Sequence, residues 1–354
     1  MYLSLALLAL FVAGISWILV YPSRFLAFRF GAVAEAIGGR RIHTKATPQL
    51  GGLGIGITII AVTAFGLFRG WFPTNEIQPL QIIGFLIALV LLLVVGVLDD
   101  RYDLSSSLRL GAYVVACLIV IGTGTGIIKV TQLVGYGGFS LVWWRWGSIS
   151  LPSDLLTLGW LLSVTFATKF FDGLDGLVTG QTVIGAGLIA ALALSSAYFQ
   201  LPVAILAVII AASFLGFLPS NLNPAKQFLG ESGSVIAGFS LGFLSIVSGA
   251  KVATALMALG LPLADASLVI VGRLLRGASI FRGDDTHLHF KLLQAGLSQR
   301  QVVAIMWLIA LVFGIAAFGV QTRGKLLLVG ALLGLTTLLS VFASLARRSR
   351  QPRV

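Results

Sequence analysis

The sequence predicts an all-α, polytopic membrane protein built as a helical bundle of about eleven transmembrane helices. The chain has 354 residues, of which 58% are hydrophobic and only 10% charged, whereas about a quarter of the residues in a soluble domain are charged. The mean hydropathy is +1.02. Apolar runs of bilayer length recur along the whole chain, and the basic residues between them are unevenly distributed. These observations exclude an ordinary water-soluble protein.

Eleven apolar segments approach the roughly 20 residues that one membrane-spanning helix needs. They are 3–20, 51–68, 81–98, 109–126, 154–171, 178–197, 202–218, 233–249, 256–274, 302–320 and 325–345. The first of them lacks a basic stretch before it and a convincing small-residue cleavage site, so we interpret it as a retained span. Residues 1–346 are expected to form a single integral membrane domain, and residues 347–354 a basic cytoplasmic tail.

The distribution of Lys and Arg predicts how the bundle is oriented, because cytoplasmic loops carry an excess of basic residues. With the N-terminus outside, 18 of the 24 Lys and Arg residues fall in cytoplasmic segments, and the C-terminus is cytoplasmic. Nine of the twelve acidic residues fall on the same side. Because acidic side chains contribute little to orientation, their concentration there needs a chemical reason.

The remaining composition limits the partners. The net charge of +12 follows from the cytoplasmic excess of basic residues and their attraction to anionic lipid head groups, and no motif for nucleic-acid binding is present. The single cysteine, Cys117, excludes an intramolecular disulfide and makes a cysteine metal site untenable. In the outer segment 127–153, the turn residues 136–138 and the β-formers around 142–151 predict a small β-hairpin without chemistry of its own.

The most informative acidic residues are Asp99 and Asp100, which close the apolar run 82–98. Carboxylates are costly to bury without compensation, so they are rarely left at a lipid boundary without a use. A pair of carboxylates can bind Mg²⁺ through oxygen, or one of them can accept a proton. The alternative is that they are simple helix-end charges beside water.

A second acidic cluster is Asp172-Gly173-Leu174-Asp175-Gly176. Its glycines permit a tight turn, so the two carboxylates could converge on a nucleobase edge, a metal or a ribose. The alternative is a loop that merely ends a helix. Two Asp-Gly units between apolar runs favour the functional interpretation.

The polar loop 219–234 ends in Gly-Glu-Ser-Gly-Ser at the start of a helix, a place suited to anions. Glu231 is a candidate hard-oxygen ligand for a metal. Phe228 could stack on a flat base, and Asn221 opens the loop. The alternative is an ordinary helix start capped by Ser232.

The loop 40–52 offers cations instead of carboxylates. Arg41 and Lys45 would contact phosphates, and Gly51-Gly52 would let the backbone approach a ligand. The alternative is a basic loop beside the membrane.

Two of the three histidines, His287 and His289, lie in the polar segment 284–291. A zinc site is not supported, because cysteine ligands and a recognisable ligand spacing are missing. The two imidazoles could instead hydrogen-bond a pyrophosphate. Taken together, the clusters predict one acidic, metal-capable, phosphate-handling site at the cytoplasmic face.

In this order, the motifs resemble the polyprenyl-phosphate N-acetylhexosamine-1-phosphate transferases over nearly the whole chain. The H-x-H pattern, the eleven spans and the basic tail look like the branch that makes undecaprenyl-diphospho-GlcNAc. They look less like the branch acting on UDP-MurNAc-pentapeptide, which typically has ten spans and three adjacent histidines. The matching residues are Arg41-Ile42-His43, Pro48, Gly51-Gly52, Asp99-Asp100, Leu104-Ser105, 172–177, Asn221, Pro224-Ala225, 228–231, Gly233-Ser234, Pro262, Asp265 and 287–289.

The resemblance implies a Mg²⁺-dependent enzyme, with Mn²⁺ as an alternative ion, in the bacterial inner membrane. It would transfer a sugar-1-phosphate, expected to be GlcNAc-1-phosphate, from a UDP-sugar to undecaprenyl phosphate and release UMP. A homodimer is also implied. Together with the chemistry of the clusters, it gives catalytic roles to Asp99 and Asp100, metal-binding roles to Glu231, Asp100 and Asp172, and substrate-binding roles to Lys45, Lys169, Asp172, Asp175, Asn221, Phe228, His287 and His289.

Three residues depart from the family pattern. Glu231 stands where the family usually has Asp, which keeps the charge but adds a methylene group. Lys169 stands where it usually has Asn, and an ammonium would repel Mg²⁺, so we expect Lys169 to contact a phosphate or a carboxylate. Phe290 stands where the family has a further histidine. These departures leave the identity of the sugar and the metal requirement open.

Three other functions remain as alternatives. Phospho-MurNAc-pentapeptide transfer is the nearest of them. A transporter or flippase is another, because buried acids also mark ion pathways, although the polar clusters are predicted at one membrane face and no inverted repeat is visible. The third is a catalytically inactive relative that binds lipid or nucleotide.

Overall fold

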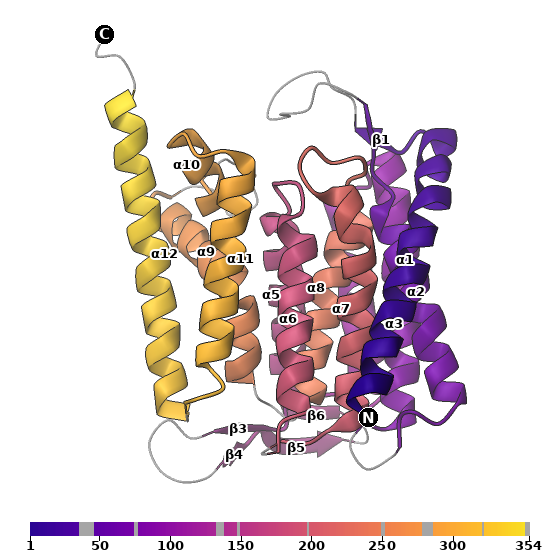
Figure 1. The fold of residues 1–354 in the computed structure, drawn as a ribbon. Coiled ribbons are helices and arrows are strands. Elements are labelled where there is room, and N and C mark those ends of the chain that lie inside the picture. Colours follow the sequence, from indigo (N-terminus) through magenta and orange to yellow (C-terminus); the bar gives the residue numbers. More distant parts are fainter. Residues whose placement is uncertain are drawn as a thin grey trace.

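The structure is a computed structural model that describes residues 1–34, 46–73, 77–131, 138–146, 149–196, 198–248, 252–277, 286–320 and 322–350. Within these residues the chain is mainly helical, with short antiparallel strand pairs (Figure 1). The helices are α1 Tyr2–Phe30, α2 Gly51–Phe68, α3 Pro79–Tyr102, α4 Ser106–Gly122, α5 Ser153–Phe171, α6 Leu177–Ala193, α7 Leu201–Asn221, α8 Gly230–Val247, α9 Val252–Leu275, α10 Leu288–Gln294, α11 Gln299–Ala316 and α12 Thr322–Arg350. The strands are β1 Val33–Ala34, β2 Thr47–Pro48, β3 Lys129–Thr131, β4 Gly138–Ser140, β5 Val142–Trp146 and β6 Ile149–Pro152.

Each of the eleven apolar segments coincides with a helix of the bundle. Among the described residues, eight helices are long and apolar enough to cross a membrane: α1, α2, α3, α5, α7, α8, α11 and the greater part of α12. α4 and α6 are apolar but only 17 residues long. The chain is thus an all-α, multi-pass membrane protein, while the number eleven stays a prediction. The seven-residue α10 was not predicted as a separate helix, because it is too short for an apolar period to reveal it.

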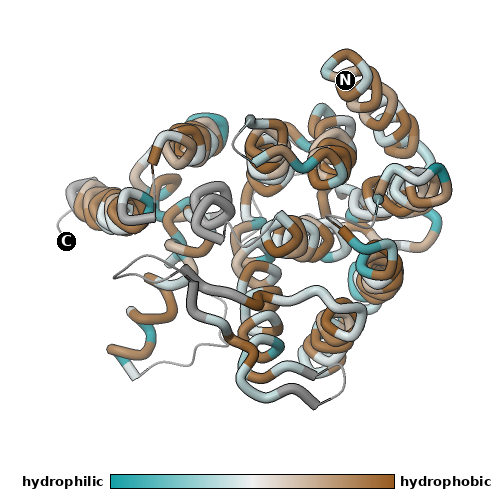
Figure 2. Tube along the Cα trace, turned by 90° about the horizontal axis from the view of Figure 1, so that it is seen from below, coloured by the Kyte–Doolittle hydropathy of each residue, from teal (hydrophilic) through white to brown (hydrophobic). Residues whose placement is uncertain are grey.

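Large apolar side chains cover the outside of the bundle. Leu10 of α1 and Leu327 of α12 are 72% and 77% exposed, and helices at the edge are as hydrophobic along their length as those inside (Figure 2). Contiguous apolar surface of this extent is unfavourable in water, but lipid tails solvate it at no cost. The bilayer therefore explains why these helices keep an apolar outer face.

The interior is organised around α8, whose residues 232–246 are all buried. Phe85 of α3 stacks against Phe239 and Phe243 of α8, with ring centroids 6.3 and 4.4 Å apart. α2 also approaches α8 closely: a Cβ atom added to Gly52 would lie 2.1 Å from the backbone nitrogen of Gly233. Small residues are what permit helices in lipid to come so near. These contacts fix where α8 begins, and its first turn belongs to the candidate site.

The two ends of the bundle differ in character. The start of α1 and the strands β3 to β6 lie at one end, whereas α10, the connection from α7 to α8 and the end of α12 lie at the other (Figure 1). The predicted hairpin is present, because β5 and β6 pair antiparallel with Trp146 opposite Ile149. β3 and β4 also pair, and the turn predicted between them lies outside the described residues. β1 and β2 form a short pair beside the opposite end.

Candidate active site

A cavity of about 550 Å³ opens at the end of the bundle that carries α10. The end of α3, the turn after α5, the connection from α7 to α8 and the start of α8 form its walls. Segments far apart in sequence therefore meet there. Seven of the predicted site residues line the cavity: Asp99, Asp100, Asp172, Asp175, Asn221, Phe228 and Glu231.

Asp99 lies in the last turn of α3 and is held by two donors. The guanidinium of Arg109, in the first turn of α4, lies 3.0 Å from Asp99 Oδ2. The backbone N–H of Leu104 donates to Asp99 Oδ1 at 2.8 Å. Asp99 is 8% exposed, so its charge is poorly screened and the paired cation compensates for its burial. The arrangement places the carboxylate of Asp99 on the cavity wall, with a cation fixed beside it.

Asp100 is bound to the first turn of α8. Its Oδ1 accepts a hydrogen bond from the backbone N–H of Glu231 at 2.7 Å, and its Oδ2 accepts one from the hydroxyl of Ser232 at 2.8 Å. A carboxylate at this place satisfies N–H groups that have no partner within the helix and interacts favourably with its dipole. In the described structure Asp100 thus positions α8, and its predicted roles in catalysis and metal binding stay predictions.

Gly230 makes this contact possible. It has φ of +77°, a conformation in which glycine carries no steric penalty. A Cβ atom there would lie 2.0 Å from the carbonyl oxygen of Gln49 and 2.7 Å from Asp100 Oδ2. Any larger residue would push α8 away from α3.

Glu231 is the centre of a small polar cluster made of Glu231, Lys169 and Tyr113. The ammonium of Lys169, in the last turn of α5, forms an ion pair with Glu231 Oε1. The hydroxyl of Tyr113, on α4, donates a hydrogen bond to the same oxygen. The Lys169 nitrogen also lies 5.7 Å from the centre of the Tyr113 ring. Of the two expected partners of Lys169, a carboxylate is therefore the one present.

The turn after α5 and the connection from α7 to α8 are joined by polar side chains. Asn221 Oδ1 accepts hydrogen bonds from the Gly176 N–H and the Thr179 hydroxyl, and its Nδ2 donates to the carbonyl of Gln227. Asp175 Oδ2 accepts from Asn223 Nδ2 at 3.0 Å and from the backbone of the same connection. Asn221 and Asp175 thereby hold the two loops in one rigid unit.

Asp172 is the carboxylate of this turn that points to the cavity without such support. Its carboxylate makes no hydrogen bond among the described residues, although its backbone N–H donates to the Lys169 carbonyl. Burial, together with the negative charges of Glu231, Asp100 and Asp175, raises the pKa of its carboxyl to about 8. A cation in the cavity would therefore stabilise the ionised form of Asp172, which has no other cation or hydrogen-bond donor at its carboxylate within the described part of the chain.

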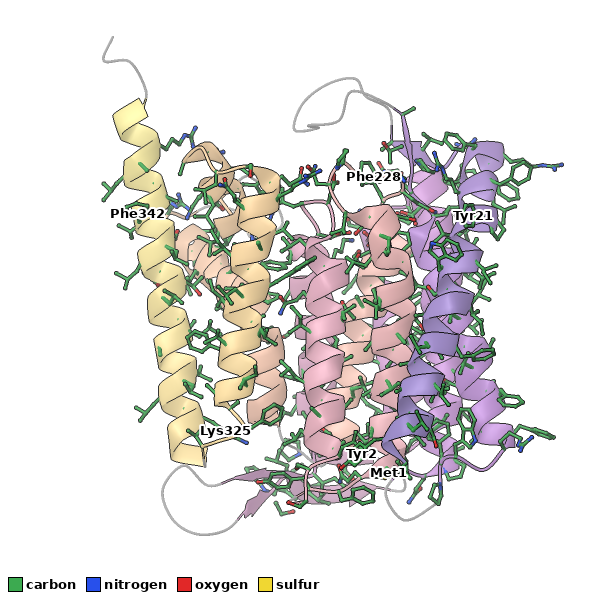
Figure 3. The ribbon with its side chains drawn as sticks, viewed as in Figure 1. Met1, Tyr2, Tyr21, Phe228, Lys325 and Phe342 are labelled. Atoms are coloured by element: carbon green, nitrogen blue, oxygen red, sulfur yellow. The ribbon has the colours of Figure 1, made fainter. Side chains whose placement is uncertain are left out.

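Phe228 lies at the same end of the bundle (Figure 3) and is fixed by its backbone. Its N–H donates to the carbonyl of Pro48, and its carbonyl accepts from the Gly51 N–H at 3.1 Å. Gly52 donates to the Leu229 carbonyl. Gly51 and Gly52 thus approach another backbone segment and another helix, and their approach to a ligand stays a prediction.

The predicted histidines lie behind the cavity wall. His287 Nδ1 lies 2.8 Å from Asp265 Oδ2 of α9, whose other oxygen accepts from the Leu288 N–H. His289 is fully buried, and its ring stacks on His287 with centroids 5.7 Å apart. Neither ring nitrogen of His289 has a partner among the described residues. Burial lowers the pKa of His289 to about 4, so the ring is neutral near pH 7.

The remaining predictions fall on other parts of the chain. Lys45 and Arg41 lie outside the described residues, as do the two aspartates that precede Thr286. Lys169, His287 and His289 are near the cavity but do not line its wall, and Lys169 reaches it through Glu231.

Sequence reasoning gave no role in the site to Arg109, Tyr113 or Asn223. Arg109 and Tyr113 are four residues apart, so they share one face of α4, and this spacing of polar groups in an apolar helix was an available signal. Asn223 had no signal in the sequence, because polar residues are common in polar loops and most of them have no role in a site. Asp265 was named only among the residues that carry the family resemblance, and its partner His287 became apparent only in three dimensions.

The carboxylates permit only one kind of metal site. No group of three or more His, Cys, Asp or Glu side chains within the described residues is placed to hold a metal ion. A Mg²⁺ site needs fewer protein ligands, because Mg²⁺ commonly binds one or two carboxylates together with waters and substrate phosphates. Asp172 and Glu231 are hard-oxygen donors on the same cavity wall, and this pair fits such a site.

Known proteins resemble the chain over most of its length. The sequence model of glycosyl transferase family 4 matches residues 82–249, which include α8 and both acidic clusters. The chain is 32% identical to a Bacillus subtilis protein named "Probable undecaprenyl-phosphate N-acetylglucosaminyl 1-phosphate transferase", over 82% of this chain and 78% of that protein.

Two other relatives extend the comparison. A Mycobacterium tuberculosis decaprenyl-phosphate N-acetylglucosaminephosphotransferase is 33% identical, over 89% of this chain and 81% of the relative. A Halalkalibacterium halodurans phospho-N-acetylmuramoyl-pentapeptide-transferase is 29% identical, over 79% of this chain and 85% of the relative. The chain therefore belongs to glycosyl transferase family 4 and is a membrane-embedded enzyme of sugar-phosphate transfer.

Proposed function

We propose that the chain transfers GlcNAc-1-phosphate from UDP-GlcNAc to a polyprenyl phosphate such as undecaprenyl phosphate, releasing UMP. The observation that carries this proposal is the meeting of six acidic residues around one cavity at the end of a membrane bundle. Two of these acids, Asp99 and Glu231, are paired with Arg109 and Lys169. The names of the relatives above 30% identity support GlcNAc-1-phosphate as the transferred group. Phospho-MurNAc-pentapeptide transfer is less favoured, because the relative with that name is less similar.

The donor is proposed to lie along the cavity wall. Phe228 offers its ring to the uracil face, and Asp175 lies where a carboxylate can accept hydrogen bonds from a base or ribose. The pyrophosphate would then lie on the side of the cavity where Lys169 pairs with Glu231. Contacts of the pyrophosphate with His287 and His289 stay predictions, because both rings lie behind the cavity wall. Asn221 would act by keeping the two donor-binding loops together, since its amide is already occupied.

The acceptor is proposed to enter from the bilayer with its phosphate beside Asp99 and Arg109. Arg109 would attract the phosphate, and Asp99 would orient it or take its proton. An acceptor phosphate oxygen would attack the sugar-linked phosphorus, forming one P–O bond while the bond to the UMP oxygen breaks. A covalent aspartyl-phosphate route is the competing mechanism.

We further propose Mg²⁺ as the cofactor, with Mn²⁺ as a substitute, held by Asp172 and Glu231. When bound, the ion would neutralise charge on the pyrophosphate, and charge neutralisation with positioning supplies most of the catalysis in phosphoryl transfer. The chain's own contribution is the positioning: Asp100 fixes the backbone of Glu231, and the loop that carries Asp172 is tied to α7 through Asn221.

The proposed setting is the bacterial inner membrane, with eleven spans and the cavity on the cytoplasmic side. The N-terminus would then be outside and the tail 347–354 inside, since α1 begins at the end opposite to the cavity. A transporter is not favoured, because the polar clusters gather at one end of the bundle instead of its middle. The homodimer implied by the family resemblance stays a prediction.

One assay tests the proposal. The purified protein is incubated with labelled UDP-GlcNAc, undecaprenyl phosphate and Mg²⁺, and labelled lipid and UMP are measured. We expect both products in equal amounts, and a panel of UDP-sugars in parallel identifies the preferred donor. Absence of labelled lipid with every donor would refute transfer. UMP without labelled lipid would indicate hydrolysis instead.

A further inference from the structure

We propose that Lys169 is a built-in counter-ion for Glu231, and that this pairing makes divalent-cation binding conditional on the nucleotide diphosphate. The inference rests on the proposed function and specifies how the same site is regulated. One oxygen atom, Glu231 Oε1, both forms the ion pair with the ammonium of Lys169 and accepts the hydrogen bond from the hydroxyl of Tyr113. A metal ligand oxygen cannot keep both of these donors and also coordinate a cation.

The surroundings of the pair make this competition strong. The side chains of Lys169 and Glu231 are only 18% and 15% exposed, so solvent and salt screen their charges weakly. A divalent cation arriving at Glu231 must displace the ammonium or remain beside it. In a partly buried site, like charges a few ångströms apart repel appreciably.

The neighbouring carboxylates offer little compensation for this repulsion. Asp99 already pairs with Arg109, and both oxygens of Asp100 accept hydrogen bonds from the first turn of α8. Asp172 remains, but a single carboxylate does not form a Mg²⁺ site without further ligands. The free protein is therefore built to bind a divalent cation poorly.

The donor changes this balance. A pyrophosphate supplies negative charges and acceptor oxygens, and a lysine ammonium has three donors on a flexible stem. Lys169 can then turn from Glu231 to a phosphate oxygen, which leaves Glu231 Oε1 available to the cation. The cation gains phosphate ligands at the same moment. Donor and cation should therefore bind cooperatively, and each should raise the affinity of the other by the same factor.

The test measures cation binding and needs no turnover. The full chain in detergent is titrated with Mn²⁺, and bound and free Mn²⁺ are distinguished by electron paramagnetic resonance, with and without saturating UDP-GlcNAc. For the unaltered protein we expect UDP-GlcNAc to strengthen Mn²⁺ binding at least about tenfold (about 1.4 kcal/mol). For Lys169→Met we expect Mn²⁺ alone to bind at least about tenfold tighter than to the unaltered protein.

Three further variants sharpen the result. Lys169→Asn, a second neutral variant, should behave as Lys169→Met, and covers the case in which the Met variant does not fold. Lys169→Arg keeps the charge and should keep Mn²⁺ binding weak without the donor. Lys226→Met removes a positive charge from the exposed part of the connection from α7 to α8, and should titrate like the unaltered protein. Thermal unfolding of each variant confirms that it is folded.

The outcomes separate the two proposals. If folded neutral variants bind Mn²⁺ alone no tighter than the unaltered protein does, the counter-ion role of Lys169 is wrong, whatever the enzyme transfers. If Lys226→Met gains as much affinity as Lys169→Met, the effect is one of net charge and the specific pairing is wrong. If calorimetry shows no binding of UDP-GlcNAc to the unaltered protein, the proposed donor itself is wrong.

Discussion

The carboxylates around the cavity are chemically alike but have different partners, and the partners suggest different uses. Asp99 faces a guanidinium, Asp100 faces the start of α8, and Glu231 faces an ammonium and a phenol. A carboxylate tied to backbone N–H groups is best suited to hold structure. One paired with a mobile or partly exposed cation can exchange that cation for a substrate group. The acids are therefore expected to respond differently to substitution.

Asp99→Asn should reduce turnover by at least about 100-fold, because an amide cannot take a proton and no longer pairs with Arg109. The measurement is the initial rate of labelled-lipid formation at saturating Mg²⁺. Asp103→Asn is the matched control: its side chain is 98% exposed, and asparagine tolerates its left-handed backbone. The control should stay within about threefold of the unaltered rate. Near-normal turnover of Asp99→Asn would show that the catalytic assignment is wrong.

We expect His289 to make the free energy of unfolding depend on pH. Its pKa is about 4 in the folded protein against 6.5 for the free side chain, so the unfolded chain binds the proton more readily. The stability that the neutral ring allows is complete above about pH 6.5 and is lost as the pH falls towards 4. Asp265 favours the protonated ring and His287 opposes it.

Replacing His289 by Leu should remove this term. Between pH 7.5 and pH 5, the unaltered protein should lose about 2 kcal/mol more of unfolding free energy than His289→Leu does. Near neutral pH the variant should be about as stable or more so, because a buried polar ring without partners costs free energy. Chemical unfolding in detergent at the two pH values measures the difference. Equal losses in the two proteins would contradict the low pKa.

At the scale of elements, the site depends on where α8 begins. Its first turn is fixed by Asp100 from α3, by the β2–α2 segment through Phe228 and Leu229, and by Lys169 from α5. α4 contributes Tyr113. Apolar packing deeper in the bundle holds each of these helices. The polar first turn of α8 is therefore held in place by helices that are themselves fixed. The site residues thus lie at the ends of helices, and the packing of the central parts of the same helices fixes their positions.

Gly230→Ala tests the position of this turn. The added Cβ atom would meet the Gln49 carbonyl, and the backbone would keep a positive φ. We expect a loss of about 2–4 kcal/mol in unfolding free energy and a large loss of activity. Gly111→Ala, on an exposed face of α4 with open space around it, is the control and should be neutral or stabilising. A stable, active Gly230→Ala protein would contradict the described start of α8.

At the scale of the whole molecule, the bundle presents apolar side chains outward and has most of its charges at one end. The apolar sides match a lipid environment, and the charged end matches charged reactants in water. Lipid tails cover the sides, and water-borne and lipid-borne reactants meet where the helices end. A transferase that moves a sugar phosphate from a nucleotide to a polyprenyl phosphate needs such a boundary.

Cysteine labelling tests the proposed orientation. In a Cys117→Ala background, Lys226→Cys places a thiol beside the cavity, and Trp144→Cys places one on β5, where the side chain is 80% exposed. A membrane-impermeant maleimide should label the β5 thiol in intact cells and the cavity thiol only in inside-out vesicles. Reversed labelling would place the cavity outside, and the donor would then have to be an extracellular nucleotide sugar.

The sequence by itself determined the membrane class, the approximate position of each long helix along the chain and which acidic residues are brought together. It could do so because apolar length and charge position are local properties that a bilayer selects directly. The hairpin of β5 and β6 was predictable for the same reason, since alternation and turn residues are read within a few positions.

Only the tertiary structure decided which partner each polar group has. Gly51 and Gly52 contact the backbone of the connection from α7 to α8, and the Asn221 amide joins two loops. Lys169 pairs with Glu231, which is 62 positions away in the sequence. These pairings depend on how helices from distant parts of the chain pack, and residue type and spacing along the chain do not encode that. Contacts between helix ends are set by the core of the bundle, which no single motif contains.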